Sequence, residues 1–104
     1  MDGHMHAVLE YLYDDNYLQT REKYRSDHLR AAWEAVERGD LLLGGAVGDG
    51  PFSGLLIFTG ENALEAARAF AAADPYVTGG VVNSWTARPW TTVVGKEAAT
   101  PVRP

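Results

Sequence analysis

The sequence predicts an α+β fold of the ferredoxin-like type, with the element order βαββαβ and two helices on one face of an antiparallel sheet. Three observations predict this class. Four short segments are apolar enough for strands, two segments have helical composition, and one helical segment follows the first strand while the other follows the third. A chain of 104 residues has the length of a single domain.

The first strand and the first helix are expected within residues 5–38. Residues 5–13 are apolar at odd and even positions alike, as in a strand covered on both sides. Residues 14–16 are turn formers, and residues 17–38 contain neither Gly nor Pro, which predicts one continuous helix ended by Gly39. On a helical wheel, an apolar stripe expected to face the core contains Leu18, Leu29, Ala32 and Val36, with Trp33 on its flank.

The other strands are recognised from apolar runs bounded by turn residues. Residues 41–47 and 52–59 are such runs, and the Gly- and Pro-containing segment 48–51 between them predicts a β-hairpin. Two glycines after the second helix lead into a last apolar segment, residues 81–88. We expect this segment to return to the sheet as the fourth strand.

The second helix is predicted from residue 62 to about Ala73. Asn62 and Glu65 have the spacing of a capping box, and the segment is rich in Ala, which is a strong helix former. Asp74 before Pro75 ends this helix, because the residue before a proline avoids the helical conformation. An Asp at that position also serves as the N-cap of a short helical turn that begins with the proline.

Composition and charge exclude several function classes. Nine Lys and Arg against fourteen Asp and Glu give a formal net charge of −5, which argues against nucleic-acid binding through an overall cationic surface. The chain has no cysteine, so disulfides and thiolate chemistry are excluded. The apolar runs are far shorter than the ~20 residues of a membrane helix, and no signal peptide is recognisable. We therefore expect a cytoplasmic protein with no nucleic-acid or membrane partner.

The domain organisation is expected to be simple. Residues 5–90 are predicted to form one ferredoxin-like domain. Residues 1–4 are interpreted as the remnant of an expression tag. Residues 91–104 lack a clear period, and two interpretations of them remain open: an arm that crosses to a second protomer, or a frayed tail.

The sheet face without helices is expected to be an interface. The third strand carries Phe52, Leu56 and Phe58 on one parity and Leu55 and Ile57 on the other, so neither face of it suits water. An uncovered apolar sheet marks an interaction surface. The sequence therefore predicts a homodimer that packs sheet against sheet.

Three side chains are candidates for a site. On the helical wheel Arg25 lies about 20° from the centre of the apolar stripe, so it needs a carboxylate, a carbonyl or a bound anion as partner. His28 lies on the edge of the same stripe, and Asp74 follows the second helix. The structural alternatives are a snorkelling arginine, a hydrogen-bonded histidine and a helix cap. If Asp74 also orients His28, the pair has the composition of a general base.

The segments that contain these residues resemble the YciI-like (YCII-related) family. The similarity lies in Arg25-Ser26-Asp27-His28-Leu29, in Gly39-Asp40-Leu41 followed by Gly44-Gly45, and in Ala73-Asp74-Pro75-Tyr76 followed by Gly79-Gly80. It spans residues 5–90, and Asp49-Gly50-Pro51-Phe52 is similar to a D-G-P-F motif of related proteins. The resemblance implies a dimeric α+β barrel and a cleft faced by His28 and Asp74, with Arg25 binding an anionic group. It also implies lyase- or dehydrohalogenase-like proton chemistry on small organic acids.

Two functions follow as hypotheses. In the first, the protein is a small-molecule enzyme of lyase, isomerase or hydrolase type: His28 is the general base, Asp74 orients it, Arg25 holds a substrate carboxylate, and Tyr76 lines the pocket or donates a proton. In the second, the same cleft belongs to a non-catalytic module that binds a small anionic ligand or a partner. No metal is predicted, because His4, His6 and His28 lack a ligand pair at helical spacing. No cofactor is predicted either, because no helix follows the glycine-rich turn that could otherwise hold a nucleotide phosphate.

Overall fold

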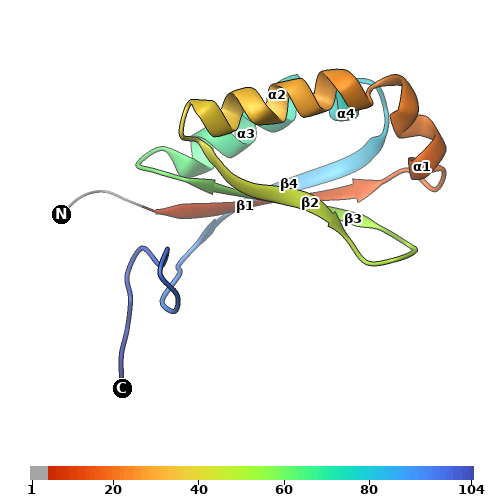
Figure 1. The fold of residues 1–104 in the computed structure, drawn as a ribbon. Coiled ribbons are helices and arrows are strands. Elements are labelled where there is room, and N and C mark those ends of the chain that lie inside the picture. Colours follow the sequence, from red (N-terminus) through yellow and green to blue (C-terminus); the bar gives the residue numbers. More distant parts are fainter. Residues whose placement is uncertain (1–4) are drawn as a thin grey trace.

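A four-stranded antiparallel sheet carries the helices on one of its faces (Figure 1). The computed structural model describes residues 5–104, so the interpretation of residues 1–4 as a tag remnant lies outside the described residues. The strand order is β2-β3-β1-β4, which confirms the predicted ferredoxin-like arrangement. The elements are β1 (His6–Tyr13), α1 (Tyr17–Thr20), the 3₁₀ turn η1 (Arg21–Lys23), α2 (Arg25–Glu37), β2 (Leu41–Val47), β3 (Ser53–Thr59), α3 (Ala63–Ala73), α4 (Pro75–Thr78) and β4 (Val82–Trp90).

The core lies between the sheet and the helices. In the central strand β1, Ala7, Leu9 and Tyr11 are fully buried and point toward the helices, as alternation in a strand requires. Phe58 of β3 lies opposite Ala7 in the register and is buried on the same face. Helix α3 closes this face with the small side chains of its buried stripe and with Phe70. The closely packed centre of the sheet therefore supports the side chains that lie at the edge of this core.

The predicted continuous helix over residues 17–38 is wrong, because the chain breaks at Tyr24. Tyr24 has φ −112° and ψ −2°, and the segment before it forms only the short helix α1 and the turn η1. The Tyr24 ring lies against Gly79, where a Cβ atom would stand 2.5 Å from the ring. This contact with the end of α4 outweighs the helical propensity of a segment without Gly or Pro.

The prediction that the apolar stripe faces the core holds for Ala32, which packs against the core, but it is wrong for the large side chains of the stripe. Leu29 is 40% exposed and Trp33 66% exposed, whereas Ala35 is the fully buried residue of α2. Helix α2 contacts the core through the small side chain of Ala35. Its large apolar side chains therefore lie beside strand β2 and not between the helix and the sheet. Leu18 of the predicted stripe is half exposed on α1, which the break separates from α2.

The end of α3 and the start of α4 agree with the predicted helix boundaries, but the predicted capping box at Asn62 does not form. Asn62 has φ −112° and ψ 34°, and its side chain makes no capping hydrogen bond. An N-cap side chain reaches the helix from an extended backbone, which Asn62 lacks. Asp74 has that backbone (ψ 126°), and its Oδ1 accepts a 3.0 Å hydrogen bond from the Tyr76 N–H. The predicted cap at Asp74 is thus confirmed.

The opposite face of the sheet has no helix over it (Figure 1). Leu12 is 62% exposed and Leu43 69% exposed on this face, and an Arg88–Glu10 ion pair lies on it. The C-terminal residues 91–104 leave the edge strand β4 and project from the sheet. They fold back on themselves, since the Thr100 N–H donates to the Thr92 carbonyl at 3.0 Å. Within residues 5–104, no helix combines the length and apolarity needed to cross a membrane.

Candidate active site

Asp74 is the centre of a buried hydrogen-bond network. Its side chain is fully buried, and both carboxylate oxygens accept hydrogen bonds. Oδ2 accepts from the Tyr11 hydroxyl at 2.7 Å, and Oδ1 accepts from the Tyr76 backbone N–H at 3.0 Å. The third partner is the imidazole of His28, whose Nδ1 lies 2.8 Å from Oδ1. A buried carboxylate requires such a set of donors, because an unpaired charge in the interior is costly.

The network fixes the position and the tautomer of His28. Because the Asp74 carboxylate can only accept, the neutral ring carries its proton on Nδ1 and leaves Nε2 with a free lone pair. The ring is stacked on Tyr76, with centroids 3.7 Å apart and planes 4° apart, and Phe70 meets its edge at 6.4 Å. The His28 side chain retains 13% exposure, so a small part of this fixed ring reaches solvent.

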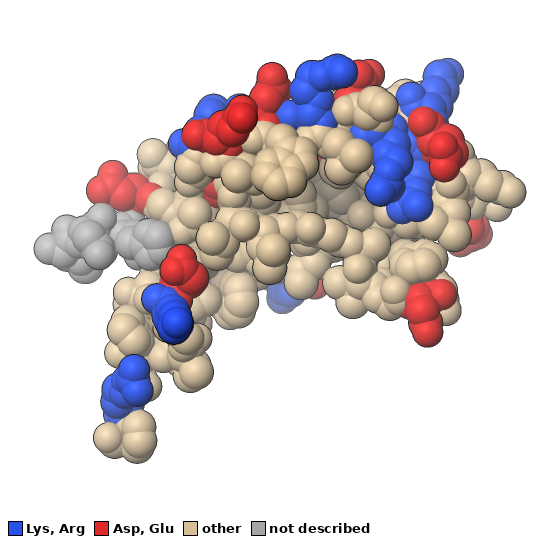
Figure 2. All heavy atoms as spheres, viewed as in Figure 1, with Lys and Arg blue, Asp and Glu red and all other residues tan. Residues whose placement is uncertain are grey.

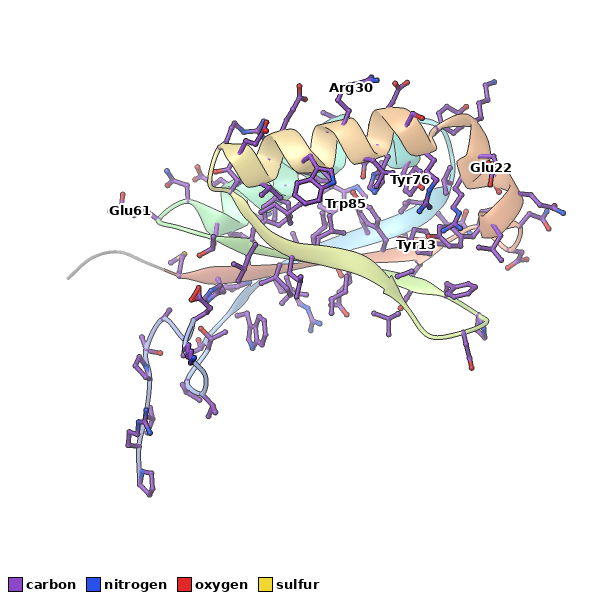
Figure 3. All side chains as sticks on the ribbon, in the orientation of Figure 1. Tyr13, Glu22, Arg30, Glu61, Tyr76 and Trp85 are labelled. Atoms are coloured by element: carbon purple, nitrogen blue, oxygen red, sulfur yellow. The ribbon has the colours of Figure 1, made fainter. Side chains whose placement is uncertain are left out.

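His28 opens into a cavity of about 430 Å³ between α2 and β2. Figure 3 shows Tyr76 and Tyr13 between the helix layer and the sheet, whereas Arg30 points away from the molecule. One end of the cavity is lined by polar side chains: Tyr13, Tyr17, Arg21, Arg25, His28 and Tyr76. The remainder is lined by α2 residues beyond His28 and by β2. The arrangement therefore places a fixed imidazole at the polar end of an otherwise apolar cavity.

Arg25 lies at the mouth of this cavity. The prediction that it points into the core is wrong, since Arg25 is exposed: the helix break makes it the first residue of α2, at the open end of the layer. Its guanidinium hydrogen-bonds the Tyr76 hydroxyl, and none of the ion pairs among residues 5–104 includes Arg25. Burial and the neighbouring Tyr17 raise the pKa of Tyr76, while the Arg25 and Arg21 charges oppose the rise. Tyr76 is therefore a neutral phenol beside two cations.

The other phenols of the site are also held neutral. Burial, followed by the Asp74 charge and its hydrogen bond, keeps the pKa of Tyr11 far above its ordinary value. Burial and the neighbouring Tyr17 do the same for Tyr13, whose ring stacks on Tyr17 at 3.8 Å. Tyr11 is thus a permanent hydrogen-bond donor to Asp74 near neutral pH.

Gly54 of β3 makes room for the phenol cluster. A Cβ atom at Gly54 would stand 2.4 Å from the Tyr13 hydroxyl and 3.0 Å from the Tyr11 Cβ. Those contacts are too close for any larger residue without movement of Tyr13. The glycine therefore allows Tyr13 to occupy its place at the polar end of the cavity.

The structure brings His28, Asp74, Tyr76 and Arg25 to one place, and it adds two residues that the sequence analysis missed. Tyr11 was assigned only to the first strand, although an inward-facing tyrosine on a buried strand needs a partner for its hydroxyl. Arg21 fell within the predicted helix 17–38 without an assigned role, and it lines the cavity. His6 is distant from this site and hydrogen-bonds Thr92 at 2.7 Å.

Comparisons with known proteins support the fold, and they cover the segments that contain His28 and Asp74. The fold is a ferredoxin-like α+β fold, with the strand order β2-β3-β1-β4. The model of the YCII-related domain matches residues 5–91, and the chain belongs to this family. No curated protein shows significant similarity to the chain.

Among solved structures, one similar chain is 5-chloro-2-hydroxyhydroquinone dehydrochlorinase (TftG) from Burkholderia phenoliruptrix AC1100, in complex with 2,5-dihydroxybenzoquinone. The TM-score is 0.68 at 20% sequence identity, and the match covers 90% of this chain and 99% of the other. At this identity the likeness establishes the shared fold.

Proposed function

We propose that this protein is a small-molecule enzyme that moves a proton on an organic acid, in a reaction of lyase or isomerase type. The observation that carries the proposal is the His28–Asp74 contact of 2.8 Å, made by an imidazole ring that lines a cavity. A general base needs a free lone pair, a fixed orientation and access to substrate. The His28 ring meets all three requirements.

Each polar side chain then has a role in the proposed reaction. His28 Nε2 takes a proton from a carbon of the substrate, and the charge that develops on the imidazole lies beside the Asp74 carboxylate. Asp74 is a positioning residue, because its oxygens are occupied by Tyr11, Tyr76 and His28. Arg25 holds the substrate carboxylate at the mouth of the cavity. The neutral Tyr76 hydroxyl donates a hydrogen bond to the substrate or returns a proton.

The lyase type is supported by the solved relative of the same fold. That protein is a dehydrochlorinase, and its structure holds a dihydroxybenzoquinone. Dehydrochlorination removes HCl, so it requires loss of a proton and departure of chloride. Proton removal by a fixed imidazole is the step that the present site can supply.

We further propose that the protein acts as a homodimer joined through the uncovered sheet faces. Leu12, Leu43 and Trp90 expose apolar surface there, and the C-terminal arm borders a cavity of about 490 Å³ against the same face. Exposed apolar side chains on a sheet face are stabilised when a second copy covers them. The His28 cavity is lined by α2 on one side and by the edge strand β2 on the other.

Sedimentation at micromolar concentration tests the dimer. We expect a species of about twice the 11.3 kDa chain mass, and a single Ile57→Lys substitution on the uncovered face should produce monomers. Arg30→Gln, on the exposed side of α2, is the matched control and should remain dimeric. A monomeric wild-type protein would refute the dimer without affecting the proposed chemistry.

Deuterium incorporation from D₂O tests the proposed chemistry even though the natural substrate is not identified. The protein is incubated with a set of organic acids that carry an acidic C–H bond next to a carbonyl or on a hydroxylated ring, and exchange is followed by proton NMR. We expect exchange of one specific hydrogen in at least one acid. Acids that bind to the cavity without any exchange would support the alternative function of a non-catalytic binding module.

A further inference from the structure

We propose that the substrate of the His28 site is an organic carboxylate with an extended apolar body. Its carboxylate would lie between Arg21 and Arg25, and its body would occupy the groove between α2 and β2. This inference rests on the proposed function, because it assumes that the reacting carbon lies beside His28. It goes further by assigning a second arginine to the anion and a hydrophobic body to the substrate.

The polar end of the cavity has two cations that lack a counter-ion. None of the ion pairs within residues 5–104 includes Arg21 or Arg25. Arg21 is held in place by Tyr17, whose hydroxyl accepts from Nη1 at 2.9 Å and whose ring lies 4.9 Å from the guanidinium carbon. The Nε–H of Arg21 is buried and has no hydrogen-bond partner among the described residues.

A buried donor without a partner is uncommon in folded proteins and is costly in free energy. A carboxylate is the ligand that fits this place, because it accepts hydrogen bonds from guanidinium groups on two oxygens and neutralises their charge. Arg21 and Arg25 are four residues apart across the Tyr24 break, and both line the same cavity. The phenols of Tyr17 and Tyr76 can donate further hydrogen bonds to the anion.

The rest of the groove is apolar and exposed. Trp33 is 66% exposed, Leu29 40%, Leu42 42% and Val36 36%, and all four line the cavity. Figure 2 shows uncharged surface along α2 and β2 below the charged outer side of the helices. Gly44 of β2 also lines the cavity, and a Cβ atom there would stand 3.2 Å from the Leu56 side chain. Such a surface is stabilised when an apolar group covers it.

The order of these side chains along α2 gives the orientation of the ligand. Arg25, His28, Trp33 and Val36 succeed one another along the helix and line one cavity, with Arg25 and Val36 about 16 Å apart at ~1.5 Å per residue. An acid that lies along the groove therefore has its carboxylate at Arg25, its next carbons beside His28, and its apolar body against Trp33. The carbon next to the carboxylate is then the one from which His28 removes a proton.

Binding of a graded series of acids tests this inference without any turnover. Acetate, benzoate and 2-naphthoate are titrated into the full-length protein by calorimetry, with neutral 2-naphthol as a fourth probe. We expect 2-naphthoate to bind at least ~10-fold more tightly than acetate; tenfold is ~1.4 kcal/mol, the effect of burying about 60 Å² of apolar surface. We expect 2-naphthol to bind at least ~10-fold more weakly than 2-naphthoate, because it lacks the carboxylate.

Three variants locate the two ends of the ligand. Arg21→Gln should weaken all three carboxylates at least ~10-fold, whereas Trp33→Ser should remove most of the 2-naphthoate advantage and change acetate affinity less than ~2-fold. Arg30→Gln, on the exposed side of the same helix, is the matched control and should change nothing. Thermal melts of each variant confirm that it is folded.

The inference is overturned if the three acids bind equally, if 2-naphthol binds as tightly as 2-naphthoate, or if Arg21→Gln and Trp33→Ser both leave the affinities unchanged. The proposed function fails separately. Predicted binding without deuterium exchange in any acid refutes the chemistry alone, and exchange without preference for apolar acids refutes this inference alone.

Discussion

Replacing Asp74 by alanine is expected to lower the free energy of unfolding by about 3–5 kcal/mol. The substitution removes the acceptor of three donors at once: the Tyr11 hydroxyl, the Tyr76 N–H and His28 Nδ1–H. Each buried donor left unpaired costs ~1–3 kcal/mol, and loss of a helix cap costs ~1 kcal/mol. Since small domains are stable by only about 5–15 kcal/mol, Asp74→Ala should be the most damaging change in the site. Urea unfolding followed by circular dichroism measures this effect.

Two further variants make that prediction specific. Asp74→Asn keeps an oxygen for the Tyr76 N–H and for His28, while its amide can donate to the Tyr11 oxygen, so we expect a loss of only about 1 kcal/mol. Asp27→Ala removes an exposed carboxylate paired with Arg30 and should change stability by less than ~0.5 kcal/mol. An Asp74→Ala protein as stable as the Asp27→Ala control would show that the buried network does not support the fold.

Replacing His28 by glutamine is expected to slow deuterium exchange by at least ~10²-fold, measured on an acid that the wild-type protein exchanges in D₂O. General acid–base catalysis by a positioned side chain contributes about 10²–10⁴-fold, and glutamine has no basic lone pair of comparable strength. Its amide N–H₂ can still donate to Asp74, so the fold should persist. NMR exchange rates at fixed pH and saturating acid measure the effect on the chemical step.

The matched control is His6→Gln, because His6 is the other histidine among residues 5–104 and hydrogen-bonds Thr92 away from the cavity. We expect the His6→Gln protein to catalyse deuterium exchange in the same acid at the wild-type rate. Equal rates for the wild type and His28→Gln would remove His28 from the chemistry and leave the site as a binding pocket.

The strand order and the region of the site could be predicted from the sequence for specific reasons. Apolar runs with turn residues between them determine which segments pair, and the Asp74-Pro75 dipeptide places a cap at a known point after α3. The motif segments around His28 and Asp74 lie far apart in the chain, and their meeting follows from the βαββαβ order because α2 and α4 lie on the same face of the sheet.

The rest of the site depends on contacts that local patterns do not contain. Tyr24 breaks the first helix by packing on Gly79, which is distant in sequence, and this break moves Arg21 and Arg25 to the mouth of the cavity. A wheel drawn through a continuous helix therefore assigned Arg25 to the core. The same wheel assigned Leu29 to the core, whereas it lies with Trp33 in the groove. Helix propensity depends only on the local segment, whereas packing between distant segments determines where Arg25 and Leu29 lie.

The ring nitrogens of His28 provide the most direct measurement. In a long-range ¹H–¹⁵N NMR spectrum of the neutral ring, we predict that the single proton is on Nδ1, held by Asp74, and that Nε2 carries none. Addition of a bound carboxylic acid should shift the Nε2 signal more than the Nδ1 signal. A ring protonated on Nε2 alone, or one whose nitrogens do not respond to any acid that binds, would contradict the assignment of His28 as the base.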